Sequence, residues 1–231
     1  MLFRSSVVAV MLAALAASAG ANHPEGNLDV TMTKREKFFE AVDRPAPDFD
    51  LVDARGRAVS LSGLSEKIVV LHFIFASCPG VCPLHAEKLA DVQRMINSSP
   101  MKDLVQFVSI TTDPATDTGS VLEAYGPEHG LDPVNWTFLT VPSGRDEATT
   151  RTLAKAFNHE FVKQDDGLQT HGVVTHVIDK GGRWAANFHG LEFEDLNLVL
   201  YVNGLTNSTP HAHKDNSKGG LFQRIWKSIW D

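Results

Sequence analysis

The chain has little of what marks several protein classes. With 231 residues and only two cysteines, it is too large and too cysteine-poor to be a minidomain held together by disulfide bonds. Acidic residues exceed basic ones, and the formal net charge of −7 argues against a nucleic-acid partner. The apolar stretch at residues 7–17 falls short of the roughly 20 residues that cross a bilayer. What remains is the composition of an ordinary globular protein.

The N-terminal residues have the pattern of a secretory signal. One positive charge, Arg4, precedes the apolar stretch, and small residues follow up to Ala21. We therefore expect residues 1–21 to be a cleaved signal peptide, with an uncleaved membrane anchor as the alternative. No cysteine follows the cleavage site, which disfavours a lipoprotein. The mature protein is thus expected in an extracytoplasmic, periplasmic setting, where oxidants reach its thiols.

Apolar runs alternate with amphipathic stretches, which predicts an α/β fold around a mixed sheet. Strands are expected at 68–75, 104–110, 136–141, 173–179 and 184–188, and helices at 34–42, 83–97, 118–125, 146–157 and 192–203. An edge hairpin is expected just after residue 45, where apolar and polar positions alternate before a glycine turn. The domain is predicted to span 45–203, after an N-terminal arm at 22–44.

The predicted helix at 83–97 has an apolar stripe that should face the core. Its members are Leu84, Leu89, Val92, Met95 and Ile96.

A polar linker at 204–220 leads to a final segment at 221–231. On a helix, the apolar side chains of that segment share one face, while Arg224 and Lys227 share the other. Two interpretations stay open for this amphipathic helix: contact with a membrane surface, or docking on its own domain or a partner. In the linker, His211 and His213 are candidates for a loose, exposed metal site.

Cys78 and Cys82 lie four residues apart, directly after the predicted strand at 68–75. On one helical turn such residues share a face, so the two sulfurs can converge on one metal ion or on each other. Pro83 favours a helix start nearby, which would leave Cys78 in the preceding loop. A strand followed by two cysteines is typical of thioredoxin-like redox proteins, although their usual spacing is one residue shorter.

Histidines and acidic residues are candidates for the surroundings of the cysteine pair. His85 follows Cys82 on the same helical face, whereas His171 lies just before the strand at 173–179, and the residues alone do not choose between them. His72 lies inside the predicted buried strand, where a hydrogen-bonded core imidazole is expected. At Asp113 we expect a turn, and either Asp117 or Thr118 is expected to cap the next helix, with a role of the two acids beside the site or in partner docking as the alternative.

Three segments resemble the Sco/SenC family of copper-binding assembly factors for cytochrome c oxidase: 73–83 (FIFASCPGVCP), 109–118 (SITTDPATDT) and 170–182 (THGVVTHVIDKGG). The resemblance covers residues 45–203 and implies a thioredoxin-like fold. It also implies that Cys78, Cys82 and His171 bind copper, with His85 as the fallback. Gly172 departs from the family pattern, because a small hydroxyl residue would be usual after the histidine.

The function implied by this resemblance is that of a copper metallochaperone. It would deliver one Cu(I) or Cu(II) ion per monomer to the dinuclear copper centre of a respiratory oxidase, or to a related cuproprotein. Thiolates and imidazole suit copper, and zinc would accept the same atoms, but structural zinc normally has four protein ligands.

An enzymatic alternative uses the same residues. A thiol:disulfide oxidoreductase would use Cys78 and Cys82 to reduce the cysteines of the copper acceptor. Oxidation to a Cys78–Cys82 disulfide would switch copper binding off, so both activities can coexist. A peroxide-reducing relative is the weakest interpretation, because no arginine lies near the cysteines in the sequence.

Overall fold

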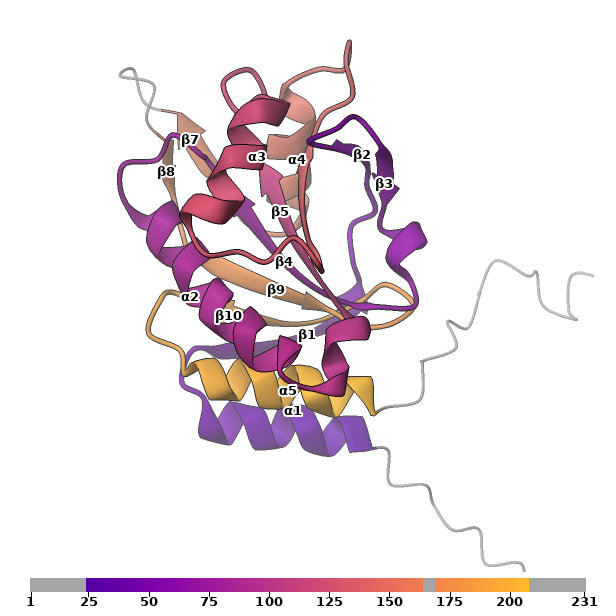
Figure 1. The fold of residues 1–231 in the computed structure, drawn as a ribbon. Helices are drawn as coiled ribbons and strands as arrows, with labels where there is room; N and C mark the ends of the chain where they lie inside the picture. Colours follow the sequence, from indigo (N-terminus) through magenta and orange to yellow (C-terminus); the bar gives the residue numbers. More distant parts are fainter. Residues whose placement is uncertain (1–23, 164–168, 208–231) are drawn as a thin grey trace, which may run out of the picture.

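A central mixed β-sheet organises the computed structural model, which describes residues 24–163 and 169–207 (Figure 1). Eight strands lie in the spatial order β1-β10-β9-β4-β5-β6-β2-β3. Their bounds in that order are β1 Phe39–Pro45, β10 Arg183–His189, β9 Val174–Ile178, β4 Ile68–Ile74, β5 Val105–Thr111, β6 Trp136–Thr140, β2 Asp50–Asp53 and β3 Ala58–Ser60. Strands β4, β5 and β6 are parallel, while the strands flanking them are antiparallel to their neighbours.

Helices cover both faces of this sheet. They are α1 Pro24–Arg35, α2 Val81–Asn97, α3 Gly119–Glu128, α4 Ala148–Ala156 and α5 Asp195–Thr206, with two short 3-10 helices at Ser62–Leu64 and Pro100–Asp103. Side chains of α1, α2, α3 and α5 pack in one hydrophobic cluster on one face, and α4 packs in a second cluster on the other. Figure 1 shows α1 and α5 side by side beneath the sheet. The α/β sandwich expected from the sequence is confirmed.

The strand that leads to the cysteines is the most deeply buried element. All seven residues of β4 are buried, as the continuous apolar run predicts. It pairs in parallel with β5, from Ile68 opposite Val105 to Ile74 opposite Thr111, and antiparallel with β9 on its other side. Since both edges and both faces are covered, the carboxyl end of β4 is held in one place.

The other predicted strands and helices are confirmed with boundaries shifted by a few residues, including the hairpin of β2 and β3 at the sheet's edge. The prediction for α2 is wrong in one detail. Leu84 is 55 % exposed, because it points away from the buried face of α2, which is formed by Ala86, Leu89, Val92 and Ile96. Trp184, Phe188 and Phe193 are buried, as residues packed in a core should be.

The predicted helix at 34–42 is wrong. Helix α1 ends at Arg35, and the chain then turns into β1, whose Phe39 lies opposite Phe188 of β10. The Glu36 carboxylate holds this turn, since it accepts hydrogen bonds from the N–H of Phe38 (3.0 Å) and the N–H of Glu194 (3.0 Å). Burial of the Phe39 ring against the sheet therefore outweighs the weak local preference for a helix.

Two further strands were not anticipated. Strands β7 (Phe161–Lys163) and β8 (Gln169–His171) form a small antiparallel ribbon separate from the main sheet. The predicted signal peptide, the linker after residue 207 and the amphipathic segment 221–231 lie outside the described residues. Within the described ranges, no helix has the length and apolar character needed to cross a membrane.

Phe188 provides a test of the cluster that joins the sheet to α1 and α5. Its ring is fully buried and contacts the rings of Phe39, Phe193 and Tyr201 at centroid distances of 5.4, 5.4 and 5.9 Å. Replacement by alanine should lower the free energy of unfolding by about 3–5 kcal/mol, because it removes this packing and leaves a cavity. Urea denaturation measures the loss.

The matched control is Leu196→Ala, at a leucine that is 53 % exposed on the neighbouring helix α5. It should change the free energy of unfolding by no more than about 0.5 kcal/mol. A loss below about 1 kcal/mol for Phe188→Ala would contradict the packing described here.

Candidate functional site

The two cysteines lie at the junction of β4 and α2. The N–H of Cys78 donates to the carbonyl oxygen of Phe75 (2.9 Å), so Cys78 belongs to the loop that follows the strand. Gly80 caps α2, which makes Cys82 the second residue of the helix. The interpretation that places both cysteines on one helical face is therefore wrong, and the one that leaves Cys78 in the loop is confirmed. The distance between the two cysteine sulfurs therefore depends on the shape of this loop.

The two thiols have unequal environments. Neither cysteine forms a disulfide bond in this structure; Cys82 is 2 % exposed, whereas Cys78 is partly exposed. Burial raises the pKa of the Cys82 thiol to about 12, and the nearby Cys78 and Asp117 add to that rise. Burial also acts on Cys78, but hydrogen bonds from the N–H groups of Cys82, Gly80 and Val81 and from the Cys82 thiol outweigh it and lower the pKa of Cys78.

Asp117 ties the cysteine loop to the next strand. Its Oδ2 accepts hydrogen bonds from the N–H of Ala76 (2.9 Å) and from the hydroxyl of Thr111 (2.5 Å). The prediction that Asp117 caps the next helix is wrong, since Thr118 is the N-cap residue of α3 and no side-chain cap bond forms there. The turn expected at Asp113 is confirmed, because its carbonyl accepts the N–H groups of Thr116 and Asp117.

Two buried polar atoms near the cysteine pair have no hydrogen-bond partner among the described residues. They are Oδ1 of Asp117 and the hydroxyl of Tyr125. Burial raises the pKa of Tyr125, and the nearby cysteines, first Cys82 and then Cys78, raise it further, which places the phenol within electrostatic range of both sulfurs. The sequence pattern gave no signal for Tyr125, because the residue occupies what looks like an ordinary apolar position of an amphipathic helix.

His85, the fallback ligand, is already engaged in the core. It is buried, and its Nε2 is hydrogen-bonded to Oγ1 of Thr175 at 2.8 Å. Its ring lies 4.8 Å from that of His72. The core role expected for His72 is confirmed, because it is fully buried and its Nε2 is hydrogen-bonded to Ser109 Oγ at 3.1 Å. Burial holds the pKa of His72 down to about 3, so this imidazole stays neutral.

His171 is the last residue of β8, three positions before β9 begins, and its backbone lies opposite Phe161 of β7. The next residue, Gly172, accepts a hydrogen bond from Nε2 of His159 (2.8 Å). Because β9 pairs antiparallel with β4, with His176 opposite Leu71, the start of β9, three residues after His171, lies toward the carboxyl end of β4, where the cysteine loop begins. The side chain of His171 lies outside the described part of the structure, as do His211 and His213.

The donor set suits copper better than zinc. Within the described ranges, no three residues from the group histidine, cysteine, aspartate and glutamate come together as metal ligands. The two sulfurs alone therefore offer a soft, incomplete site, to which one imidazole carried by β8 would add a third ligand. Such a set leaves coordination positions open, whereas structural zinc sites are closed by four protein ligands.

Several solved structures share this fold, and BsSco and yeast Sco1 are two examples. BsSco, a member of the Sco family of cytochrome c oxidase assembly proteins with an identified disulfide switch, matches with a TM-score of 0.63 at 22% identity, over 73% of this chain and 98% of its own. Yeast Sco1 with copper bound matches with a TM-score of 0.61 at 23% identity, over 80% of this chain and 98% of its own. These likenesses confirm the thioredoxin-like fold.

Comparison of the sequence with known proteins identifies the family. An SCO2-like protein from Rickettsia felis is 25% identical over 161 residues, which are 68% of this chain and 75% of the relative. The family model described as SCO1/SenC matches residues 40–198, a range that includes the cysteine loop, Asp117 and His171. The chain therefore belongs to the SCO1/SenC family.

Proposed function

We propose that this protein binds copper through Cys78, Cys82 and His171 and delivers it to a copper-accepting subunit of a respiratory oxidase or a related cuproprotein. The observation that carries the proposal is the pair of reduced thiols, Cys78 and Cys82, at the start of α2 in a chain of the SCO1/SenC family. Support comes from two members of the same fold, copper-bound yeast Sco1 and BsSco with its disulfide switch.

The unequal thiols suit capture and release of a soft metal ion. Cys78 is partly exposed and its pKa is lowered by hydrogen bonds from nearby N–H groups, so it gives up its proton to an incoming Cu(I) ion more readily than Cys82 does. Cys82 then loses its proton as its sulfur joins the site, because a metal ligand must be deprotonated. Two sulfurs and one imidazole hold one copper ion per monomer and leave room for a ligand of the acceptor, which permits transfer by ligand exchange.

The second candidate function is reduction of a disulfide in the copper acceptor. The Cys78 thiolate attacks one sulfur of the target disulfide, and the other target sulfur leaves and takes up a proton. Cys82 then loses its proton and attacks Sγ of Cys78, which releases the second target thiol. The target gains two electrons and two protons, and this chain is left with a Cys78–Cys82 disulfide that no longer binds copper. The exposure of Cys78 and the burial of Cys82 favour this order.

Copper titration tests the ligand set. Reduced mature protein should bind one Cu(I) or one Cu(II) ion per monomer, with thiolate charge-transfer absorption in the Cu(II) form. The double variant Cys78→Ser/Cys82→Ser should abolish that absorption, because both thiolate ligands are gone. His171→Ala should weaken copper retention by about tenfold or more while leaving the far-UV circular dichroism unchanged.

Two further variants test which histidine is the copper ligand. His189→Ala changes a surface imidazole paired with Glu40 and should retain copper fully. His85→Asn tests the fallback, and copper retention should stay within about twofold of the parent protein if the variant folds. Loss of copper in His85→Asn together with full retention in His171→Ala would transfer the ligand role to His85.

The pH dependence of alkylation tests the asymmetry of the thiols. At pH 7 iodoacetamide should modify Cys78 faster than Cys82 by about tenfold or more, because Cys78 has the larger thiolate fraction and is the more exposed of the two. The rate at Cys78 should rise with pH and level off below the pH at which an unperturbed cysteine does. Mass spectrometry of quenched samples measures both rates.

Cys82→Ser should shift this profile, since the Cys82 thiol contributes to the lowered pKa of Cys78. Ser77→Ala, which changes an exposed neighbour, is the control and should leave the profile in place. Equal rates at the two cysteines at pH 7 would contradict the unequal environments.

We also propose an extracytoplasmic location, with the segment 221–231 holding the protein at a membrane surface. Its six large apolar side chains and two basic residues are the composition of an interfacial helix. Deletion of residues 219–231 should release the protein from the membrane fraction into the soluble fraction. Immunoblotting after ultracentrifugation, without an alkaline carbonate wash of the membranes, measures the distribution. Unchanged partitioning of the deletion variant would contradict a membrane role for this segment.

A further inference from the structure

Tyr125 of α3 carries a buried hydroxyl that has no hydrogen-bond partner among the described residues. The residue is only 4 % exposed. The chain's other tyrosine, Tyr201, is also buried, but its hydroxyl donates to Oδ1 of Asp29 at 2.7 Å. A buried hydroxyl normally has such a partner, because it has given up its hydrogen bonds to water. The partner of the Tyr125 hydroxyl is therefore to be sought in another state of the molecule.

The contacts before and after Tyr125 in the chain place it beside the start of α2. Before it, Oδ2 of Asp117 accepts the N–H of Ala76 in the cysteine loop at 2.9 Å. After it, Nδ1 of His129 lies 3.3 Å from Oε1 of Glu87 in α2. The two segments joined by these contacts therefore run side by side in the same direction. Tyr125 lies between the two contacts and hence beside the first turn of α2.

Packing and electrostatics both identify Cys82 as a neighbour of this phenol. Cys82 is the second residue of α2, and its side chain shares the buried face of the helix with Ala86, one turn later. Ala86 and Tyr125 belong to the same hydrophobic cluster. Burial raises the pKa of Tyr125, and the next largest contribution comes from Cys82, ahead of Cys78. Of the two sulfurs, that of Cys82 thus acts more strongly on the phenol.

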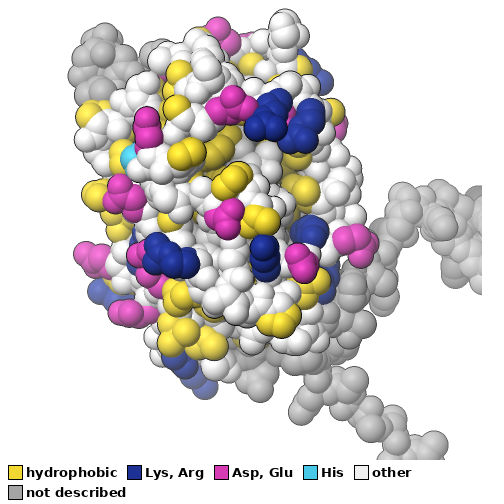
Figure 2. All heavy atoms as spheres, in the orientation of Figure 1, with side chains coloured by type: hydrophobic (Ala, Val, Ile, Leu, Met, Phe, Trp, Pro, Cys, Tyr) yellow, Lys and Arg dark blue, Asp and Glu magenta, His cyan; other side chains and the backbone are white. Residues whose placement is uncertain are grey.

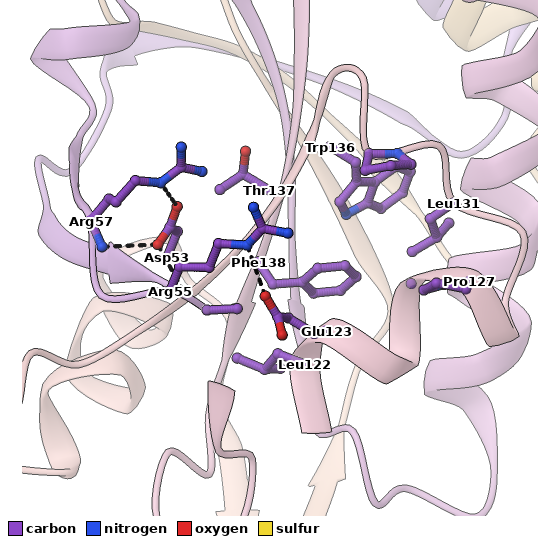
Figure 3. Close-up of a pocket in the computed structure, with 13 residues that line it drawn as sticks. Asp53, Arg55, Arg57, Leu122, Glu123, Pro127, Leu131, Trp136, Thr137 and Phe138 are labelled. Atoms are coloured by element: carbon purple, nitrogen blue, oxygen red, sulfur yellow. Dashed lines mark hydrogen bonds and ion pairs between the residues drawn. The ribbon is translucent and has the colours of Figure 1, made fainter. Parts of the chain in front are cut away.

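The phenol lies away from the surface and from the cavity beside α3. Figure 2 shows acidic, basic and hydrophobic side chains mixed on the face of the molecule that carries α3, and the phenol is buried beneath that face. A cavity of about 450 Å³ borders α3, and Figure 3 shows Leu122, Glu123 and Pro127 along its wall. Tyr125 does not line this cavity, so its ring projects from a different face of the helix.

We propose that the Tyr125 hydroxyl donates a hydrogen bond to Sγ of Cys82 whenever that sulfur is a thiolate, both in the copper site and during disulfide exchange. This inference rests on the proposed function, because both activities require Cys82 to lose its proton. A neutral thiol is a weak acceptor, whereas a thiolate is a strong one, which explains why the hydroxyl lacks a partner while Cys82 is protonated.

A donor at this position offsets the surroundings of the Cys82 sulfur, which disfavour negative charge. Burial is the main cause, and the nearby Asp117 adds to it. The rings of His129 and Phe138 hold the phenol in place, with centroids 4.3 and 5.9 Å from that of Tyr125. The donor is therefore already fixed in the core before the thiolate forms.

In disulfide exchange the donor acts on one step only. With glutathione disulfide as the probe, the Cys78 thiolate attacks one glutathione sulfur, and the other glutathione leaves and takes up a proton. Cys82 then loses its proton and attacks Sγ of Cys78, which closes the Cys78–Cys82 disulfide and releases the second glutathione as a thiol. Only this second step uses the Cys82 thiolate, so only this step should depend on the hydroxyl of Tyr125.

The test uses the full mature chain with Tyr125→Phe, which removes the oxygen and keeps the ring. Acid-quenched mixtures of reduced protein and glutathione disulfide, analysed by mass spectrometry, should show the mixed disulfide at Cys78 accumulating in the variant. The second step should be about three- to tenfold slower than in the parent protein, and the first step should stay within about twofold. In the Cu(II) form, the thiolate charge-transfer absorption should move to longer wavelength, because the sulfur has lost a hydrogen-bond donor.

The matched control is Tyr201→Phe, which removes the hydroxyl of the other buried tyrosine and should leave both exchange steps and the absorption band unchanged. It should lower the urea midpoint, because that hydroxyl has a partner in Asp29, whereas Tyr125→Phe should leave the midpoint unchanged or raise it.

An unchanged second step together with an unmoved absorption band in Tyr125→Phe would overturn the donor role, whatever its urea midpoint. The exchange measurement contains no copper, so it stays informative if the parent protein fails to bind the metal. In that event the copper proposal would be contradicted, while a slower second step in Tyr125→Phe would still support the hydrogen bond to Cys82.

Discussion

The parallel pairing of β4 with β5 is the constraint on which the rest of the molecule depends. Its register sets Ile74 opposite Thr111, so the chain leaves both strands at the same edge of the sheet. The cysteine loop therefore begins next to the segment that carries Asp117, whose carboxylate binds Ala76 and Thr111 together. A shift of the register by one residue would move the carboxyl end of β4 along β5 and separate these groups.

From this junction the two thiols acquire different properties. The helix start places Cys82 under the packed face of α2, where burial favours the neutral thiol, and leaves Cys78 in a loop where backbone N–H groups favour the thiolate. The Cys78 sulfur is thus the more reactive one, and the Cys82 sulfur loses its proton second. This order suits both metal capture and thiol exchange. The two proposed activities, copper carriage and disulfide exchange, use the same two thiols and would therefore exclude each other in time within one site.

Much of the fold could be predicted because its strands are continuous apolar runs and its helices are amphipathic. The failures have local causes. The helix expected at 34–42 is replaced by the end of α1 and by β1, since pairing with β10 buries Phe39. The exposed Leu84 was assigned to the apolar stripe of α2 but points away from its buried face, although the adjacent Cys82 and His85 are buried. The ribbon of β7 and β8 is too short to give a periodic signal in the sequence.

The sequence by itself determined the fold class, the family and the cysteine pair, because these depend on apolar periodicity and on short motifs. Only the tertiary structure decided the partners of side chains far apart in the chain. It connected Asp117 to Ala76 rather than to its own helix, engaged His85 with Thr175, and brought Tyr125 near both sulfurs. Among the described residues, it also left residues 136–138 of β6 with β5 as their only strand neighbour. Such contacts join residues of different strands and helices, and sequence spacing carries no information about them.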